Sequence, residues 1–166
     1  MRRLLYTGIA LILILPFHII SIWVYYRDTL PFMPPIEYED KVPVRNDPYG
    51  EGHFRAKRRG GRLHNGLDIT ACEGTPVFAS KGGRVIAGYQ KNGMGNYLII
   101  KHPGGLSTLY GHLSQIIAPD ASRVRQGDLI GLSGRTGNAR YKGIKGHLHF
   151  EVKKEGSYED PMNYLK

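Results

Sequence analysis

Residues 147–153 read HLHFEVK, and polar and apolar side chains alternate along the whole stretch. Because neighbouring side chains in a strand point to opposite faces, His147, His149 and Glu151 share one face and the apolar residues between them share the other. The apolar face can pack into a core, while the polar face presents two imidazoles about 6.5–7 Å apart along the chain. The stretch is therefore a strand with either a metal-binding face or a polar face that meets solvent at the edge of a sheet.

Similar short runs, rich in Val, Ile, Leu, Tyr and Phe, precede this strand and are also predicted to be strands: residues 77–80, 84–89, 97–102, 107–113 and 128–133. Turn signals made of Gly, Pro and Asn separate the runs. The chain contains 22 Gly among 166 residues, which favours turns and argues against a mainly helical fold. Residues 115–126 are expected to be irregular. The spacing predicts a mainly β fold, a compact antiparallel β-sheet or sandwich domain.

The composition excludes several classes of protein. A single cysteine, Cys72, excludes an internal disulfide framework and any Cys-rich zinc finger or iron–sulfur site. A bound metal must therefore rely on His and carboxylate ligands. The 23 Lys and Arg against 14 Asp and Glu give a formal net charge of +9. A basic surface can bind nucleic acid, but the export predicted below conflicts with that partner, so an anionic lipid surface or an acidic wall polymer is favoured.

The N-terminal segment predicts a membrane anchor. Residues 4–26 contain no Asp, Glu, Lys or Arg, and as a helix they would reach roughly 34 Å, enough to cross a bilayer core of about 30 Å. Arg2 and Arg3 precede this run, so the positive-inside rule places the N-terminus in the cytoplasm and the rest of the chain outside. A cleaved signal peptide is the alternative, but no small-residue cleavage site follows before Arg27. We therefore expect residues 1–27 to form an uncleaved transmembrane signal anchor that contacts the bilayer through residues 4–26.

Residues 28–48 contain five prolines. Proline lacks a backbone donor and resists regular structure, so this segment predicts a semi-extended spacer between the membrane and the domain. The expected organisation is an anchor over residues 1–27, a Pro-rich linker over 28–48 and one domain over 49–166.

A second polar element, HNGLD, occupies residues 64–68. A fully extended chain would place the His64 and Asp68 α-carbons about 13 Å apart, too far for two ligands of one ion. Asn65 and Gly66 supply the required break, because both tolerate unusual backbone angles. Together with residues 147–153 the chain offers three protein ligands and a spare imidazole, the pattern of a catalytic zinc site with an open position.

A third element is YGHL at residues 110–113, at the end of a predicted strand. An isolated histidine in this position is usually structural. Beside a zinc site, His112 becomes a candidate acid or base.

The three elements, in this order, resemble the zinc peptidases of the M23 family, the lysostaphin-like or LytM-type peptidoglycan endopeptidases. The resemblance covers about residues 48–166. Residues 47–68 also look like the leukocyte chemotaxin branch of the same fold, which binds metal but is not regarded as a working peptidase.

The resemblance implies a role for each polar residue. His64, Asp68 and His149 look like the ligands of Zn²⁺, with one ion per chain. His112 and His147 look like the catalytic histidines that flank the metal-bound water. All five positions are filled, whereas some family members have lost ligands and the chemotaxin branch lacks the equivalent of His112.

The function implied is that of a membrane-anchored zinc metalloendopeptidase that hydrolyses peptide cross-links of bacterial peptidoglycan through a zinc-activated water. Its partners would be stem peptides or cross-bridges of the wall. It would sit as a single-pass protein in the bacterial inner (cytoplasmic) membrane, with the catalytic domain on the periplasmic or extracellular side. The alternative is a non-catalytic module of the same fold that binds cell wall or a partner protein and uses zinc for stability alone.

One loop departs from the family pattern. Many members have a short Ser- and Thr-rich turn ending in proline before the H-x-H segment, whereas residues 138–146 form a longer loop in which Gly146 replaces that proline. The loop adds Arg140, Lys142 and Lys145. It should form one wall of the groove, where these cations either read the carboxylates of stem peptides or are simply solvated.

Two further segments allow more than one interpretation. The basic run at residues 55–62 is either a solvated face or a contact for an anionic polymer or lipid head groups. The linker near Tyr38 or Asn46 is a candidate for covering the metal and inhibiting the enzyme.

Overall fold

The structure, a computed structural model, describes residues 31–58 and 60–165. The predicted membrane anchor at residues 4–26 lies outside these residues. Within the described part of the chain, no helix is long and apolar enough to cross a membrane. The anchor therefore remains a prediction of the sequence.

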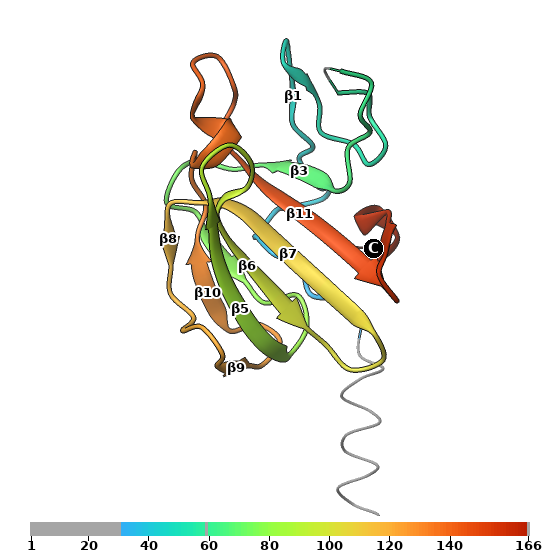
Figure 1. The fold of residues 1–166 in the computed structure, drawn as a ribbon, viewed down its shortest axis with the longest axis vertical. Coiled ribbons are helices and arrows are strands. Elements are labelled where there is room, and N and C mark those ends of the chain that lie inside the picture. Colours follow the sequence, from blue (N-terminus) through green and yellow to red (C-terminus); the bar gives the residue numbers. More distant parts are fainter. Residues whose placement is uncertain (1–30, 59, 166) are drawn as a thin grey trace, which may run out of the picture. The chain divides into compact units, whose positions relative to one another are not determined.

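Two antiparallel sheets build the domain (Figure 1). The large sheet has seven strands in the order β12-β11-β7-β6-β5-β9, and β3 pairs with β11 beside that path. Its strands are β3 (Leu67–Thr70), β5 (Gly83–Gln90), β6 (Gly95–Lys101), β7 (Leu106–Leu113), β9 (Arg123–Val124), β11 (His147–Lys154) and β12 (Ser157–Glu159). The small sheet has three strands in the order β4-β10-β8: β4 (Pro76–Phe78), β10 (Leu129–Leu132) and β8 (Gln115–Ile116). The prediction of a mainly β, antiparallel fold is confirmed.

Smaller elements accompany the sheets. A two-stranded hairpin, β1 (Asn46–Asp47) and β2 (Gly50–Glu51), stands before β3, and two short 3-10 helices follow at Gly137–Arg140 and Pro161–Asn163. All six predicted strands are present, with ends within two residues of the predicted ones. The strand β3 was not predicted: Leu67–Thr70 alternate between apolar and polar residues, but the run has only 4 residues and overlaps the HNGLD element. The region 115–126, expected to be irregular, contributes only the two-residue strands β8 and β9.

Both sheets share one hydrophobic core. Leu148, Phe150 and Val152 of β11 are fully buried, and the rings of Tyr110 and Phe150 pack with centroids 5.3 Å apart. Val77 and Ile130 of the small sheet belong to the same cluster. The apolar face of β11 thus packs as its sequence pattern predicts.

The polar face of β11 is also shielded from solvent. His147, His149 and Glu151 are 3%, 5% and 2% exposed. The strand is not at an edge, because β7 pairs along one side while β3 and β12 pair along the other. The alternative of a solvent-facing edge strand is therefore wrong, and these buried polar groups must find partners within the protein.

The described part of the Pro-rich segment lies against the sheets. We call residues 32–48 the strap. The amide of Met33 donates to the Ser80 carbonyl, and that of Phe78 donates to the Pro35 carbonyl. Ile36 is 2% exposed and belongs to the core cluster. The compact unit that contains both sheets begins at Phe32, so the strap belongs to that unit and the linker spans less of the chain than its prolines suggest.

Candidate metal centre and active-site groove

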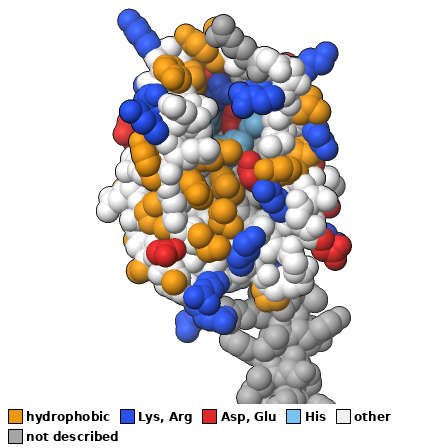
Figure 2. Space-filling model, viewed as in Figure 1, with side chains coloured by type: hydrophobic (Ala, Val, Ile, Leu, Met, Phe, Trp, Pro, Cys, Tyr) orange, Lys and Arg blue, Asp and Glu red, His pale blue; other side chains and the backbone are white. Residues whose placement is uncertain are grey.

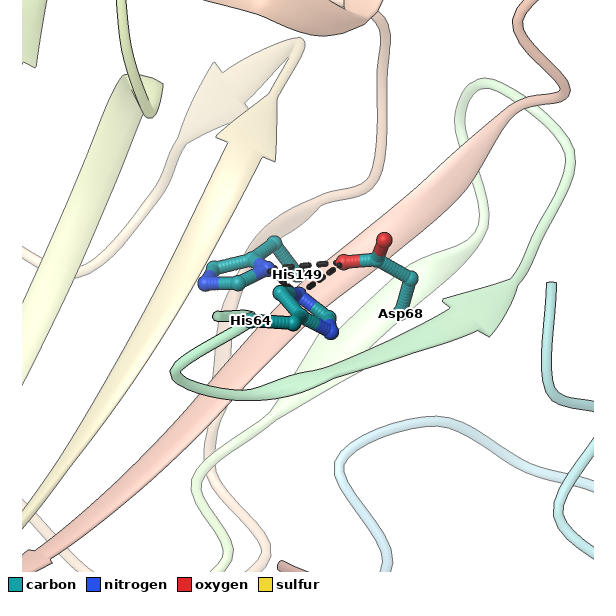
Figure 3. Close-up of side chains that lie close together, drawn as sticks. All are labelled: His64, Asp68 and His149. Carbon is teal, nitrogen blue, oxygen red and sulfur yellow. Dashed lines mark hydrogen bonds and ion pairs between the residues drawn. The ribbon is translucent and has the colours of Figure 1, made fainter. Parts of the chain in front are cut away.

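Strand register brings three polar side chains together. In the β3–β11 pair, Asp68 lies directly opposite His149. His64 precedes β3, and the chain between them turns at Gly66, where a Cβ atom would lie 2.4 Å from the Phe150 carbonyl oxygen. Ligand atoms of His64, Asp68 and His149 all lie within 4.8 Å of one another, and Figure 3 shows the three side chains pointing toward a common point.

The outer nitrogens of the two imidazoles are held by acceptors. The Nδ1 of His64 donates to the His53 carbonyl over 2.8 Å, and the Nε2 of His149 donates to Glu151 Oε1 over 3.1 Å. A carbonyl or carboxylate oxygen only accepts, so in the neutral rings the inner nitrogens carry lone pairs. Those inner atoms, His64 Nε2 and His149 Nδ1, lie 3.1 Å apart.

This donor set fits a cation. Two lone pairs facing each other repel, and either a proton or a metal ion between them removes the conflict. Without a metal, burial lowers the pKa of His149, but hydrogen bonds to Asp68 and Glu151 outweigh burial and raise that pKa to about 9. Two neutral imidazoles and one carboxylate, oriented by partners behind them, are a donor set typical of zinc sites.

Asp68 is the most heavily contacted residue of the cluster. Its Oδ1 lies 3.0 Å from His64 Nε2 and 2.7 Å from His149 Nδ1. Its Oδ2 accepts from Arg45 Nη2 and Arg58 Nη2, both over 2.8 Å. Burial alone would raise the pKa of Asp68, but hydrogen bonds from His149 and His64 hold it well below its usual range.

Sequence reasoning missed the two arginines. Arg58 lies in the basic run 55–62, which was considered only as a solvated or polymer-binding face. Arg45 lies in the strap, where no motif marks it. A buried carboxylate needs a counter-charge, and that requirement is the only sequence-level signal that could have led to them.

The other two predicted histidines face the same centre. His112 and His147 have ring centroids 4.9 Å apart, and His112 lies 5.8 Å from His149. Their Nδ1 atoms donate to backbone carbonyls, that of Thr136 over 2.9 Å and that of Lys145 over 2.7 Å. The structure thus brings all five predicted residues together.

Both of these histidines are held neutral. Burial, followed by the neighbouring His149 and His147, lowers the pKa of His112 to about 3. Burial also lowers the pKa of His147. His112 has a backbone φ of 62°, an unusual value for a residue other than glycine, and this conformation places it at the site. In each neutral ring Nδ1 carries the proton, so Nε2 carries a lone pair that can accept a hydrogen bond at the site.

The cluster lies in a groove of about 530 Å³. Figure 2 shows histidine side chains at the bottom of a hollow with Lys and Arg side chains around it. Besides the histidines, the groove is lined by Arg45, Tyr49, Arg58, Arg62, Leu63, Asn65, Asp68, Gln90, Asn92, Gly93, Met94, Asn138, Ala139, Tyr141, Ile144 and Glu151. Neither Tyr38 nor Asn46 lines it, although Arg45, next to Asn46 in the strap, does.

The long loop forms one wall, but its arginine points elsewhere. Arg140 donates to the carbonyls of Lys91 and Gly137 over 2.6 Å and 2.8 Å. It therefore ties the loop to the β5–β6 turn. Lys142 and Lys145 are exposed and remain the only cations of the loop that could read substrate carboxylates.

The sequence model of peptidase family M23 matches residues 62–161. The chain belongs to that family. It is 39% identical over 102 residues to the DD-carboxypeptidase/endopeptidase Mpg of Neisseria meningitidis, a match over 61% of this chain and 23% of Mpg. It is 38% identical over 106 residues to a lipoprotein NlpD/LppB homolog of Pseudomonas aeruginosa, over 63% of this chain and 34% of that protein. The chain thus matches about a quarter to a third of the length of these relatives.

Solved structures of M23 proteins share the fold. A zinc-containing peptidase from Vibrio cholerae superposes with a TM-score of 0.64 at 33% identity, over 80% of this chain and 40% of that one. The catalytic domain of lysostaphin from Staphylococcus simulans superposes with a TM-score of 0.58 at 32% identity, over 72% of this chain and 91% of that one. The domain is therefore lysostaphin-like, as the sequence motifs imply. The family match begins at residue 62, after the strap and the β1–β2 hairpin.

Proposed function

We propose that this chain is a zinc-dependent endopeptidase that hydrolyses peptide cross-links of bacterial peptidoglycan. One observation carries the proposal: ligand atoms of two imidazoles and a carboxylate converge within 4.8 Å of one another, and the rings of His112 and His147 lie beside them. The family and the name of Mpg support the substrate class.

The residues divide the chemistry between them. His64, Asp68 and His149 would hold the ion, and when bound it would act as a Lewis acid and bring the pKa of a water to about 7. His112 and His147 keep their protons on Nδ1, so each Nε2 can accept a proton from the attacking water. A histidine that has accepted a proton can then donate it to the leaving amine or hydrogen bond to the developing oxyanion.

The charge of the groove favours an anionic peptide. Three arginines line it, namely Arg45, Arg58 and Arg62. The carboxylates among its lining residues, Asp68 and Glu151, both have partners within the site. The side chain of Arg62 makes no hydrogen bond or ion pair within the described part of the chain, so its guanidinium is available to a substrate carboxylate.

The activity is tested with the full chain in detergent and zinc, incubated with intact sacculi of several wall types. We expect new peptide fragments by mass spectrometry, and their masses identify the bond that is cut. The control is His112→Ala, which should bind zinc and release nothing. A folded, zinc-loaded wild-type chain that binds sacculi without releasing fragments would favour the non-catalytic module.

We also propose that residues 4–26 anchor the enzyme in the inner membrane. The uncharged run and the preceding Arg2 and Arg3 support this placement. The full chain should stay in the membrane fraction after washing at high salt and at alkaline pH, and a chain lacking residues 4–26 should not. Release of the full chain by the wash would contradict the anchor.

A further inference from the structure

The strap reaches the metal centre through its backbone. The amide of Arg45 donates to the Asp68 carbonyl over 2.8 Å, and the Arg45 carbonyl accepts from Gly52 over 2.7 Å. The amide of Asp68 donates in turn to the Gly52 carbonyl over 2.8 Å. The strap therefore binds along β3 at the residue that supplies the carboxylate of the cluster.

The side chain of Arg45 joins two buried carboxylates. Its Nε and Nη2 donate to Asp68 Oδ2 over 3.2 Å and 2.8 Å, and its Nη1 donates to Asp47 Oδ2 over 2.7 Å. The side chains of Arg45, Asp47 and Asp68 are 6%, 1% and 3% exposed. With Arg58 also bound there, Asp68 Oδ2 is fully used, which leaves Oδ1 to face the two imidazoles.

Asp47 continues the connection to a catalytic histidine. Its Oδ2 accepts from the amide of Lys145 over 3.1 Å, and its Oδ1 accepts from the amide of Tyr49 over 2.8 Å. The carbonyl of the same Lys145 accepts from His147 Nδ1 over 2.7 Å. Hydrogen bonds thus run without a gap from Asp68 through Arg45, Asp47 and the Lys145 backbone to His147.

We infer that Arg45 and Asp47 are positioning residues of the active site, which fix the Asp68 carboxylate for the metal and the His147 ring for proton transfer. The inference rests on the proposed function and places part of the site before residue 62, where the family match begins. It also gives the strap a role beyond covering the core, because the side chains of Arg45 and Asp47 link a metal ligand to a catalytic histidine.

The first test measures zinc affinity of the full chain in detergent by competition with a chromophoric chelator. Arg45→Lys keeps the positive charge, but a single ammonium cannot bridge the carboxylates of Asp47 and Asp68. Asp47→Asn replaces one acceptor oxygen by an amide NH₂, which then faces one of the N–H groups that Asp47 accepts from. Residues behind metal ligands typically contribute 10–100-fold to affinity, so we expect both variants to bind zinc about 10-fold more weakly or worse.

The matched control is Val44→Ala. Val44 lies in the same strap and pairs with Ile69, but it takes no part in the hydrogen bonds that run from Asp68 to His147. It should lower the melting temperature with less than about a twofold change in zinc affinity, because it removes packing and no hydrogen bond. Unchanged zinc affinity in both Arg45→Lys and Asp47→Asn would overturn the inference. So would a loss in Val44→Ala as large as theirs, since general loosening of the strap would then explain the effect.

The second test addresses His147 at saturating zinc. Asp47→Asn should lower kcat about 10-fold or more with little change in KM, because a misplaced histidine affects the reaction and not substrate binding. Added to His147→Ala, it should cause no further loss, since both changes would remove one function. Additive losses would overturn the link to His147. Should the wild type release no fragments, the proposed function fails while the zinc measurement still decides the role of Arg45 and Asp47.

Discussion

Two pairs of histidines occupy one site and are supported differently. His64 and His149, on the β3 side, have their inner nitrogens against Asp68, and His149 is backed by Glu151. The Nδ1 atoms of His112 and His147 donate to backbone carbonyls, and the nearest carboxylate oxygen to His147 Nε2 is Asp68 Oδ1, 3.9 Å away. The pKa of His149 is raised to about 9, whereas burial and its histidine neighbours lower that of His112 to about 3. Hydrogen bonds to carboxylates therefore make the first pair a cation site, whereas burial keeps His112 and His147 neutral.

The largest expected effect separates the two pairs. His112→Ala should lower kcat by about 10²–10⁴-fold, the usual contribution of an acid–base group, and leave zinc content unchanged. His149→Ala should lose zinc as well, because it removes a ligand. Fragment release and metal analysis on the same preparations check both outcomes. Zinc loss from His112→Ala would mean that the pairs are not distinct.

The next effect tests the carboxylate behind His149. Glu151→Gln keeps the shape of the acceptor and removes its charge, so it should weaken zinc binding by about 10–100-fold. The kcat at saturating zinc should stay near that of the wild type, because Glu151 contacts a ligand histidine only. A chelator titration and initial rates measure the two quantities. A lower kcat with unchanged zinc affinity would contradict the assignment of His149 to metal binding alone.

The comparison also predicts how pH acts. In the metal-free protein His149 carries a proton below pH 9, and zinc must displace that proton, so zinc affinity should fall about tenfold per pH unit as pH drops below 9. His112 stays neutral down to about pH 3 and cannot cause an acid loss near pH 6. The acid limb of the rate profile should therefore move to lower pH as free zinc is raised. If the rate falls at the same acidic pH with scarce and with excess zinc, the loss of rate would be assigned to protonation of a catalytic histidine instead.

Local patterns in the sequence predicted the strands and the five polar residues, since alternation in 147–153 and the short motifs around His64 and His112 are properties of neighbouring residues. The arginines that bind Asp68 were not predictable in this way. Arg45 and Asp68 are separated by 23 positions, and their pairing depends on how the strap docks on β3. The prolines of the strap predicted a semi-extended spacer and gave no sign that the segment would pack against the sheets and end in the short strand β1.

The smallest expected effect concerns the wall of the groove beside the neutral pair. Arg140 joins the 138–146 loop to the Lys91 carbonyl, and the same loop supplies the Lys145 carbonyl that holds His147. Hydrogen bonds from a charged group contribute about 1.5–3 kcal/mol, and only part of that should appear in substrate binding, so Arg140→Ala should raise KM several-fold. Zinc affinity should not change, because Arg140 contacts none of the three ligand residues and Asp47 still holds the Lys145 amide. Lys142→Ala is the control: a KM increase there equal to that of Arg140→Ala would indicate that the cations of the loop read the substrate's carboxylates, and that loop anchoring is not the cause.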